Sequence, residues 1–285
     1  MRFAICQLSI ILILASGLSA QGVSKAVDAY NKGLEFQDKG DFVSALRAYD
    51  QAIALNPTMA EAYNNRANIR LANGDSAGAI ADFSKVVEFS PKNPLGYYNR
   101  GNIYLDRSEY DQAIADFTKA IDILNGLTNM YDKRAHAMSY NNRGNALAAK
   151  DDLKGAMADF NRALEIIPNS YEAFTGRGSV KERMKDYSGA VADYTQALQL
   201  SPKNTVILMN RAGALEEVDK AAAIADYTSV IELEPENAQA YARRGVLLVD
   251  RGKLAEATTD LQKALKLDPS LKADYEPWLK KAIKK

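Results

Sequence analysis

Apolar residues recur along the chain at helical spacing, in segments of similar length separated by short polar turns. In one such segment Ala113, Phe117, Ala120 and Ile121 fall at i, i+4, i+7 and i+8, on one face of a helix. Polar turns such as "ANGD" at 72–75 follow alternate segments, and prolines follow most of the others. The pattern therefore predicts a series of antiparallel pairs of amphipathic helices.

The same two phrases recur in successive helix pairs. The first phrase reads "YYNRGN" at 97–102, and the second reads "AIADFTKAIDIL" at 113–124. A period of about 34 residues indicates a repeat architecture. Repeats of this size stack on one another, because none can bury its apolar face alone. The period is read most directly from the arginine of the first phrase, whose copies are Arg66, Arg100, Arg143, Arg177, Arg211 and Arg244.

Seven repeats share a pattern of small and aromatic residues, counted as places from the first residue of each repeat. An aromatic residue stands at place four in most of them, a small residue at place eight and alanine at place 20. In most a later aromatic stands at place 24 and a proline closes the repeat. In the 33-residue repeat six the alanine and the later aromatic stand one place earlier, and they keep the same place names below. In these residues the chain resembles the tetratricopeptide repeat family across 26–271. The resemblance implies an all-α fold, a right-handed α-solenoid of about seven antiparallel helix pairs. The repeats run over 26–59, 60–93, 94–127, 137–170, 171–204, 205–237 and 238–271.

Two segments fall outside the seven repeats. The insertion 128–136 is expected to lengthen either the second helix of repeat three or the first helix of repeat four, and it ends in His136, the only histidine. Without a partner motif, this histidine is expected to be a surface or packing residue. The last segment, 272–285, is amphipathic, contains Trp278 and is expected to form a helix that caps repeat seven.

Arginine occupies place seven in six repeats, where the family usually has leucine. A guanidinium group at a position that faces other helices needs a partner. An aspartate follows each arginine at an almost constant interval, whereas repeat one has Lys32 and Ala48 at the two places. We therefore predict structural ion pairs between the two helices of a repeat, in preference to ligand binding by these arginines. The pairs are Arg66–Asp82, Arg100–Asp116, Arg143–Asp159, Arg177–Asp193, Arg211–Asp226 and Arg244–Asp260.

Asparagines recur at places six and nine, which share a helix face because they are one helical turn apart. Asparagine costs a helix roughly half a kcal/mol relative to alanine, so its repetition suggests a use. The resemblance implies that the first helices line a concave surface. An amide offers the donor and acceptor that match a peptide backbone. We call these residues the asparagine ladder and predict that it binds an extended peptide; alternatively, the amides only order the stack. The ladder consists of Asn31, Asn65, Asn68, Asn99, Asn102, Asn142, Asn145 and Asn210.

The ladder is densest in repeats two to four, since place six becomes Gly176 and Arg243 farther along. The residues Asn64, Tyr98 and Asn141, one place before the ladder, are expected to contact the partner at the rim. Some family members hold the carboxylate tail of cytosolic chaperones with Lys and Arg. Here the corresponding places carry Tyr30 and Leu95, so the chain lacks that clamp.

The N-terminal segment 1–20 has the layout of a secretory signal. Met1 and Arg2 precede the apolar run "LSIILILASGL" at 8–18, and small residues follow. We expect residues 1–20 to be removed, with cleavage after Ser19 or Gly22 as alternatives and an uncleaved anchor as another. The mature protein is then expected to be exported, periplasmic or extracellular, without a membrane span.

Charge and composition exclude several classes of function. Lys plus Arg and Asp plus Glu number 36 each, which argues against a nucleic-acid partner. With one His and one Cys, sites that use these residues to bind a metal are nearly excluded, and no cofactor is expected. No nucleophile, phosphate-binding or metalloprotease motif occurs, so we predict a non-enzymatic scaffold or adaptor that binds a protein or peptide. The alternative is a protein that binds glycan or cell-wall strands. The oligomeric state stays open.

Overall fold

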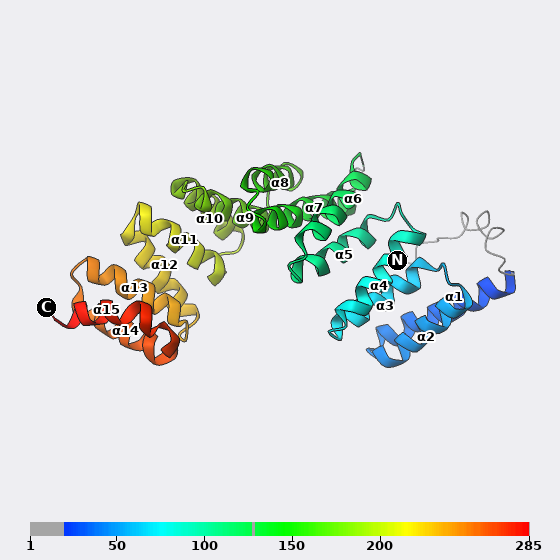
Figure 1. The fold of residues 1–285 in the computed structure, drawn as a ribbon, viewed down its shortest axis with the longest axis horizontal. Helices are drawn as coiled ribbons and strands as arrows, with labels where there is room; N and C mark the ends of the chain where they lie inside the picture. The colour runs from blue at the N-terminus through cyan, green and yellow to red at the C-terminus, as the bar shows by residue number, and fades with distance from the viewer. Residues whose placement is uncertain (1–19, 127–128, 285) are drawn as a thin grey trace. The chain divides into compact units, whose positions relative to one another are not determined.

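The computed structural model describes residues 20–126 and 129–284, and all regular structure in these ranges is helical (Figure 1). The predicted leader, apart from Ala20, lies outside the described residues. The helices are α1 (Ala20–Asp38), α2 (Phe42–Leu55), α3 (Ala60–Ala72), α4 (Ser76–Phe89), α5 (Pro94–Asp106), α6 (Tyr110–Leu124), α7 (Met130–Ala149), α8 (Leu153–Ile166), α9 (Tyr171–Arg183), α10 (Tyr187–Leu200), α11 (Thr205–Val218), α12 (Lys220–Leu233), α13 (Ala238–Asp250), α14 (Leu254–Leu267), the short 3₁₀ helix η2 (Pro269–Leu271) and α15 (Lys272–Ile283).

The chain divides into two compact units between residues 127 and 128. Helices α1–α6 form unit 1 and helices α7–α15 form unit 2. Within each unit every helix packs against the next along the chain, and in unit 2 the first helices α7, α9 and α11 also touch in order. The all-α fold of stacked helix pairs predicted from the period is confirmed.

The residues that define the repeat form the core of each unit. Ala113, Phe117 and Ala120 are completely buried and Ile121 is almost so, as their helical spacing predicts. The aromatic residues at place 24 are among the largest fully buried side chains. Opposite them, small residues at place eight leave room for the rings: a Cβ atom added to Gly101 would lie 2.9 Å from the Phe117 ring.

The turns and helix ends follow local rules. Most turns within a pair contain a residue with positive φ, which is a glycine at Gly74 but a lysine at Lys185. The second helix then often begins at an aspartate cap; Asp75, for example, accepts a hydrogen bond from the Gly78 N–H. Where a proline closes the repeat, the second helix ends just before it, as α8 does before Pro168.

The two segments outside the repeats are both helical where they are described. Residues 130–136 of the insertion lengthen the first helix of repeat four, since α7 has 20 residues, and residues 127 and 128 are not described. At the other end, α15 packs against α13 and α14, with Tyr275 and Trp278 against the buried residues Leu248 and Leu261. None of the helices in the described ranges is long and apolar enough to cross a membrane.

Candidate binding surface

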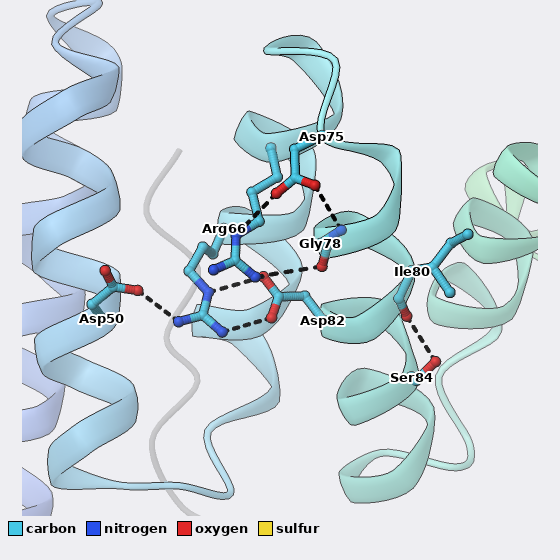
Figure 2. Close-up of polar contacts among 8 residues, drawn as sticks. Asp50, Arg66, Asp75, Gly78, Ile80, Asp82 and Ser84 are labelled. Atoms are coloured by element: carbon cyan, nitrogen blue, oxygen red, sulfur yellow. Dashed lines mark hydrogen bonds and ion pairs between the residues drawn. The ribbon is translucent and has the colours of Figure 1, made fainter.

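Each predicted arginine meets the aspartate with which its spacing pairs it. In all six pairs the arginine Nε and Nη2 atoms donate to the two carboxylate oxygens over 2.6 to 2.9 Å, which is the bidentate geometry that lysine cannot form. Figure 2 shows this fork for Arg66 and Asp82. The aspartates are buried and the arginines are partly buried. These side chains thus join the two helices of each repeat.

A third hydrogen bond links most of these arginines to the preceding repeat, and the sequence analysis did not predict it. The Nη1 atom of Arg66 donates to Asp50 at 2.6 Å, and that of Arg100 donates to Ser84 at 3.0 Å (Figure 2 shows Arg66 and Asp50). The same contact links Arg177 with Asn161, Arg211 with Thr195 and Arg244 with Thr228. Every acceptor lies 16 residues before its arginine, on the second helix of the preceding repeat. Each of these arginines therefore holds three helices together.

The surroundings keep the arginines charged. Hydrogen bonding to the paired aspartate raises the pKa of Arg100, Arg211 and Arg244 above its ordinary value. At Arg66 burial opposes the charged form, but hydrogen bonds to Asp82 and Asp50 outweigh it, so its pKa is also raised. Four place-four rings add cation–π contacts to these arginines, for example Tyr63 with its centroid 5.3 Å from the Arg66 Cζ.

Two hollows open beside these ion pairs in unit 2. One, of about 610 Å³, is lined by Thr228, Arg244 and Asp260 among others. The second, of about 290 Å³, has Arg211 and Asp226 in its lining. No asparagine of the ladder lines either hollow. The ladder is therefore separate from both hollows.

Part of the ladder is engaged within the protein. The Nδ2 atom of Asn65 donates to the Tyr30 hydroxyl at 3.2 Å and lies 3.5 Å from the Tyr49 hydroxyl, which links repeat two to repeat one. The Nδ2 of Asn64, which we expected at the rim, donates to the side-chain Oδ1 of Asn65, and the Nδ2 of Asn141 likewise donates to the Oδ1 of Asn142. At Asn65 the amide therefore orders the stack, which is the alternative role considered for the whole ladder.

Five other asparagines of the ladder have no side-chain partner among the described residues. In the described ranges no side-chain hydrogen bond is formed by Asn31, Asn68, Asn99, Asn145 or Asn210. Asn102 does have an interaction within the protein. The gap in the ladder at Gly176 has a packing cause, because a Cβ atom there would lie 2.4 Å from the Phe160 ring.

Tyrosines at place 24 bind polar side chains on the first helix of their own repeat. The hydroxyl of Tyr49 donates to Gln37 at 2.8 Å, that of Tyr194 to Glu182 at 3.0 Å, and that of Tyr227 to Glu216 at 2.6 Å. Where place 24 is phenylalanine instead, the partner position carries Leu71, Leu105 or Ala148. Burial first, and the neighbouring carboxylate second, raise the pKa of Tyr194 and Tyr227. These pairs place polar groups on the first-helix surface that sequence reasoning did not single out.

The single histidine packs against an aromatic ring. The rings of His136 and Tyr140 have centroids 5.0 Å apart, and the histidine Nε2 is buried without a hydrogen-bond partner. Burial, followed by the nearby Arg162, lowers the pKa of His136, so it is neutral at pH 7. Within the described ranges no group of His, Cys, Asp and Glu side chains could hold a metal ion.

Sequence and structure comparisons point to one family. Signatures described as tetratricopeptide repeat match residues 30–94 and 214–271, residues 94–124 and 137–170, and residues 171–204. The chain finds no match among curated proteins.

Solved structures with the same fold share little sequence with this chain. A tetratricopeptide repeat protein from Parabacteroides merdae superposes with a TM-score of 0.64 at 20% identity, over 91% of this chain and 99% of that one. YrrB, described as having an unusual peptide-binding site, gives 0.55 at 24% identity, over 70% and 96%. The pilF protein of Pseudomonas aeruginosa gives 0.61 at 18% identity, over 75% and 94%.

Proposed function

Because the chain belongs to the tetratricopeptide repeat family, whose signatures span most of its length, we propose that it is an exported, non-enzymatic scaffold or adaptor that binds an extended segment of a partner protein along its first helices. The fold is that of a protein–protein interaction scaffold. Similar structures below 25% identity support the fold alone, so the proposed site is argued from the residues of this chain.

The observation that carries the proposal is the set of amides without partners on the first helices. Asn31, Asn68 and Asn99 belong to unit 1, and Asn145 and Asn210 belong to unit 2. Each costs its helix roughly half a kcal/mol relative to alanine, and no hydrogen bond inside the described protein offsets that cost. A peptide backbone offers the complementary acceptor and donor to each amide.

We expect a triple Asn31→Ala, Asn68→Ala, Asn99→Ala variant to lose partner binding. Each lost hydrogen bond is worth about 1 kcal/mol, so three together should weaken binding roughly 100-fold. The measurement is a quantitative pull-down from an envelope extract of the producing cells, read by mass spectrometry. A protein lost from the variant would be the partner, whereas loss of glycan strands would favour the alternative of a glycan-binding protein.

The matched control removes amides from the second helices of the same unit. Gln51 and Gln112 are exposed on α2 and α6, and their replacement by alanine should leave the pull-down unchanged. Circular dichroism should show that all variants keep their helix content. Undiminished capture by the triple variant would contradict the proposed site.

Export is proposed from the leader in the sequence. N-terminal sequencing of the protein recovered from the producing cells is expected to begin at residue 21, or at 20 or 23 for the two neighbouring cleavage sites. A chain that keeps residue 1 and sediments with membranes would contradict cleavage and point to an anchor.

A further inference from the structure

In three repeats a tyrosine hydroxyl donates a hydrogen bond to a polar side chain on the first helix. These repeats differ in the residue that stands at place six of the next repeat. In repeat one the neutral Gln37 is held by Tyr49, and the place-six residue of the next repeat is the neutral Asn65, which reaches the same hydroxyl. In repeat six the charged Glu216 is held by Tyr227, and the next repeat supplies a cation, Arg243, whose Nη1 lies 3.4 Å from the Glu216 Oε2. Repeat one therefore has no charge at this place, and the charge in repeat six is paired within the protein.

Repeat five has the carboxylate but lacks the cation. The Tyr194 hydroxyl holds the Oε2 atom of Glu182 at 3.0 Å, as Tyr227 holds Glu216. At place six of the next repeat, however, stands Asn210, a neutral residue without a hydrogen-bond partner in the described protein. Among the described residues Glu182 forms no ion pair. Its charge is therefore fixed in position but not neutralised.

The place that a Gly213 side chain would take, beside the other oxygen of this carboxylate, is unfilled. The helix α11 contains Gly213 in its interior, although glycine is a poor helix former. At the other helix glycines from Gly33 to Gly245, an added Cβ atom would come within 3.1 Å of a neighbour, so packing explains them. At Gly213 the nearest atom to such a Cβ would be the Glu182 Oε1, at 3.7 Å. Packing does not require this glycine, and it leaves the carboxylate approachable.

We propose that Glu182, Asn210 and Gly213 form a subsite for a basic side chain, arginine or lysine, of the bound partner segment. The ion pair between Glu216 and Arg243 in the next repeat shows the chemistry that this arrangement accepts. The partner's guanidinium or ammonium group takes the position of the missing cation and forms a charge-assisted bond with the Glu182 Oε1. The inference rests on the proposed function and adds that the partner carries a positive charge opposite repeats five and six.

The test uses N-acetyl-arginine N-methylamide as the probe and the backbone amide resonance of Gly213 in the ¹⁵N-labelled chain as the readout. The probe is expected to shift this resonance saturably. The isosteric but uncharged citrulline compound should bind at least about tenfold more weakly, because a hydrogen bond to a charged group is worth more than one between neutral groups. An equal response to both compounds, or none, would overturn the proposal.

Two variants separate a specific subsite from a general surface effect. Glu182→Gln keeps an acceptor for the Tyr194 hydroxyl and should abolish the response. Asn210→Arg copies the arrangement at Arg243 and should also abolish it, by closing the subsite internally. Glu216→Gln, whose carboxylate is already paired, should leave the Gly213 response unchanged. A response that survives Glu182→Gln would contradict the assignment.

This readout does not depend on the asparagine ladder. If the alanine triple variant keeps its partner while the arginine probe still shifts Gly213, the ladder proposal fails and the subsite stands. If the triple variant loses its partner while the probe has no effect, the subsite fails and the ladder stands.

Discussion

Replacing Asp226 by alanine is expected to lower the free energy of unfolding by about 3 kcal/mol, at the low end of what breaking a buried ion pair costs. The Asp226 side chain is 9% exposed, and its two oxygens accept from the Nε and Nη2 of Arg211 at 2.8 Å. Without it, Arg211 retains its bond to Thr195 but loses its counter-charge. The lower end of the range applies because the arginine side chain is 22% exposed and keeps some hydration. Urea denaturation followed by circular dichroism measures the change.

A second replacement tests whether the penalty comes from the orphaned charge. Leucine is the usual residue of the family at place seven, so Arg211→Leu combined with Asp226→Ala removes both charges and restores an apolar contact. Replacement of a buried ion pair by apolar residues is often neutral or stabilising. The double variant should therefore be more stable than Asp226→Ala alone. Destabilisation equal to the sum of the two single changes would show that the residues do not act as a pair.

The pairing of arginine with aspartate could be read from the sequence, because a buried charge needs a partner of fixed type at a fixed distance. The third contact of the arginines could not be read in the same way. Its acceptors include Asp50, Ser84 and Asn161, which share only a polar oxygen. Any of these satisfies one N–H donor, so the chemistry does not impose one residue type. The constant spacing between acceptor and arginine is the signal that could have revealed them.

The asparagine ladder was visible as a pattern, but the pattern alone did not separate its members by role. The difference between Asn65 and Asn99 follows the place-five residue of the preceding repeat. That residue is Tyr30 for Asn65, and its hydroxyl accepts from the amide at 3.2 Å. For Asn99 it is Asn64, whose own amide donates to the Asn65 side chain instead. Such roles depend on side-chain neighbours across repeats, which are known once the stacking is known.

Replacing Phe160 by alanine is expected to cost about 3–5 kcal/mol, the usual effect of removing a buried aromatic ring. Phe160 is 1% exposed, and its ring lies against the glycines of two first helices. Added Cβ atoms would come within 3.1 Å of it at Gly144 and 2.4 Å at Gly176. Because both neighbours are glycines, they offer no side chains to fill the void. Urea denaturation again gives the free energy of unfolding.

Replacing Gly176 by alanine should lower the stability of the protein when Phe160 is present and raise it when Phe160 is replaced by alanine. With Phe160 present, Gly176→Ala forces a methyl group into the ring, and overpacking of this kind costs about 1–3 kcal/mol. In the Phe160→Ala background the same change meets a void, and alanine should stabilise α9 by about 1 kcal/mol over glycine. Gly213→Ala is the matched control, since a methyl group there has no neighbour closer than 3.7 Å and should be stabilising with or without Phe160. Suppose instead that Gly176→Ala changes the stability in the same direction in both backgrounds. This would contradict the explanation that the Phe160 ring requires a glycine at position 176.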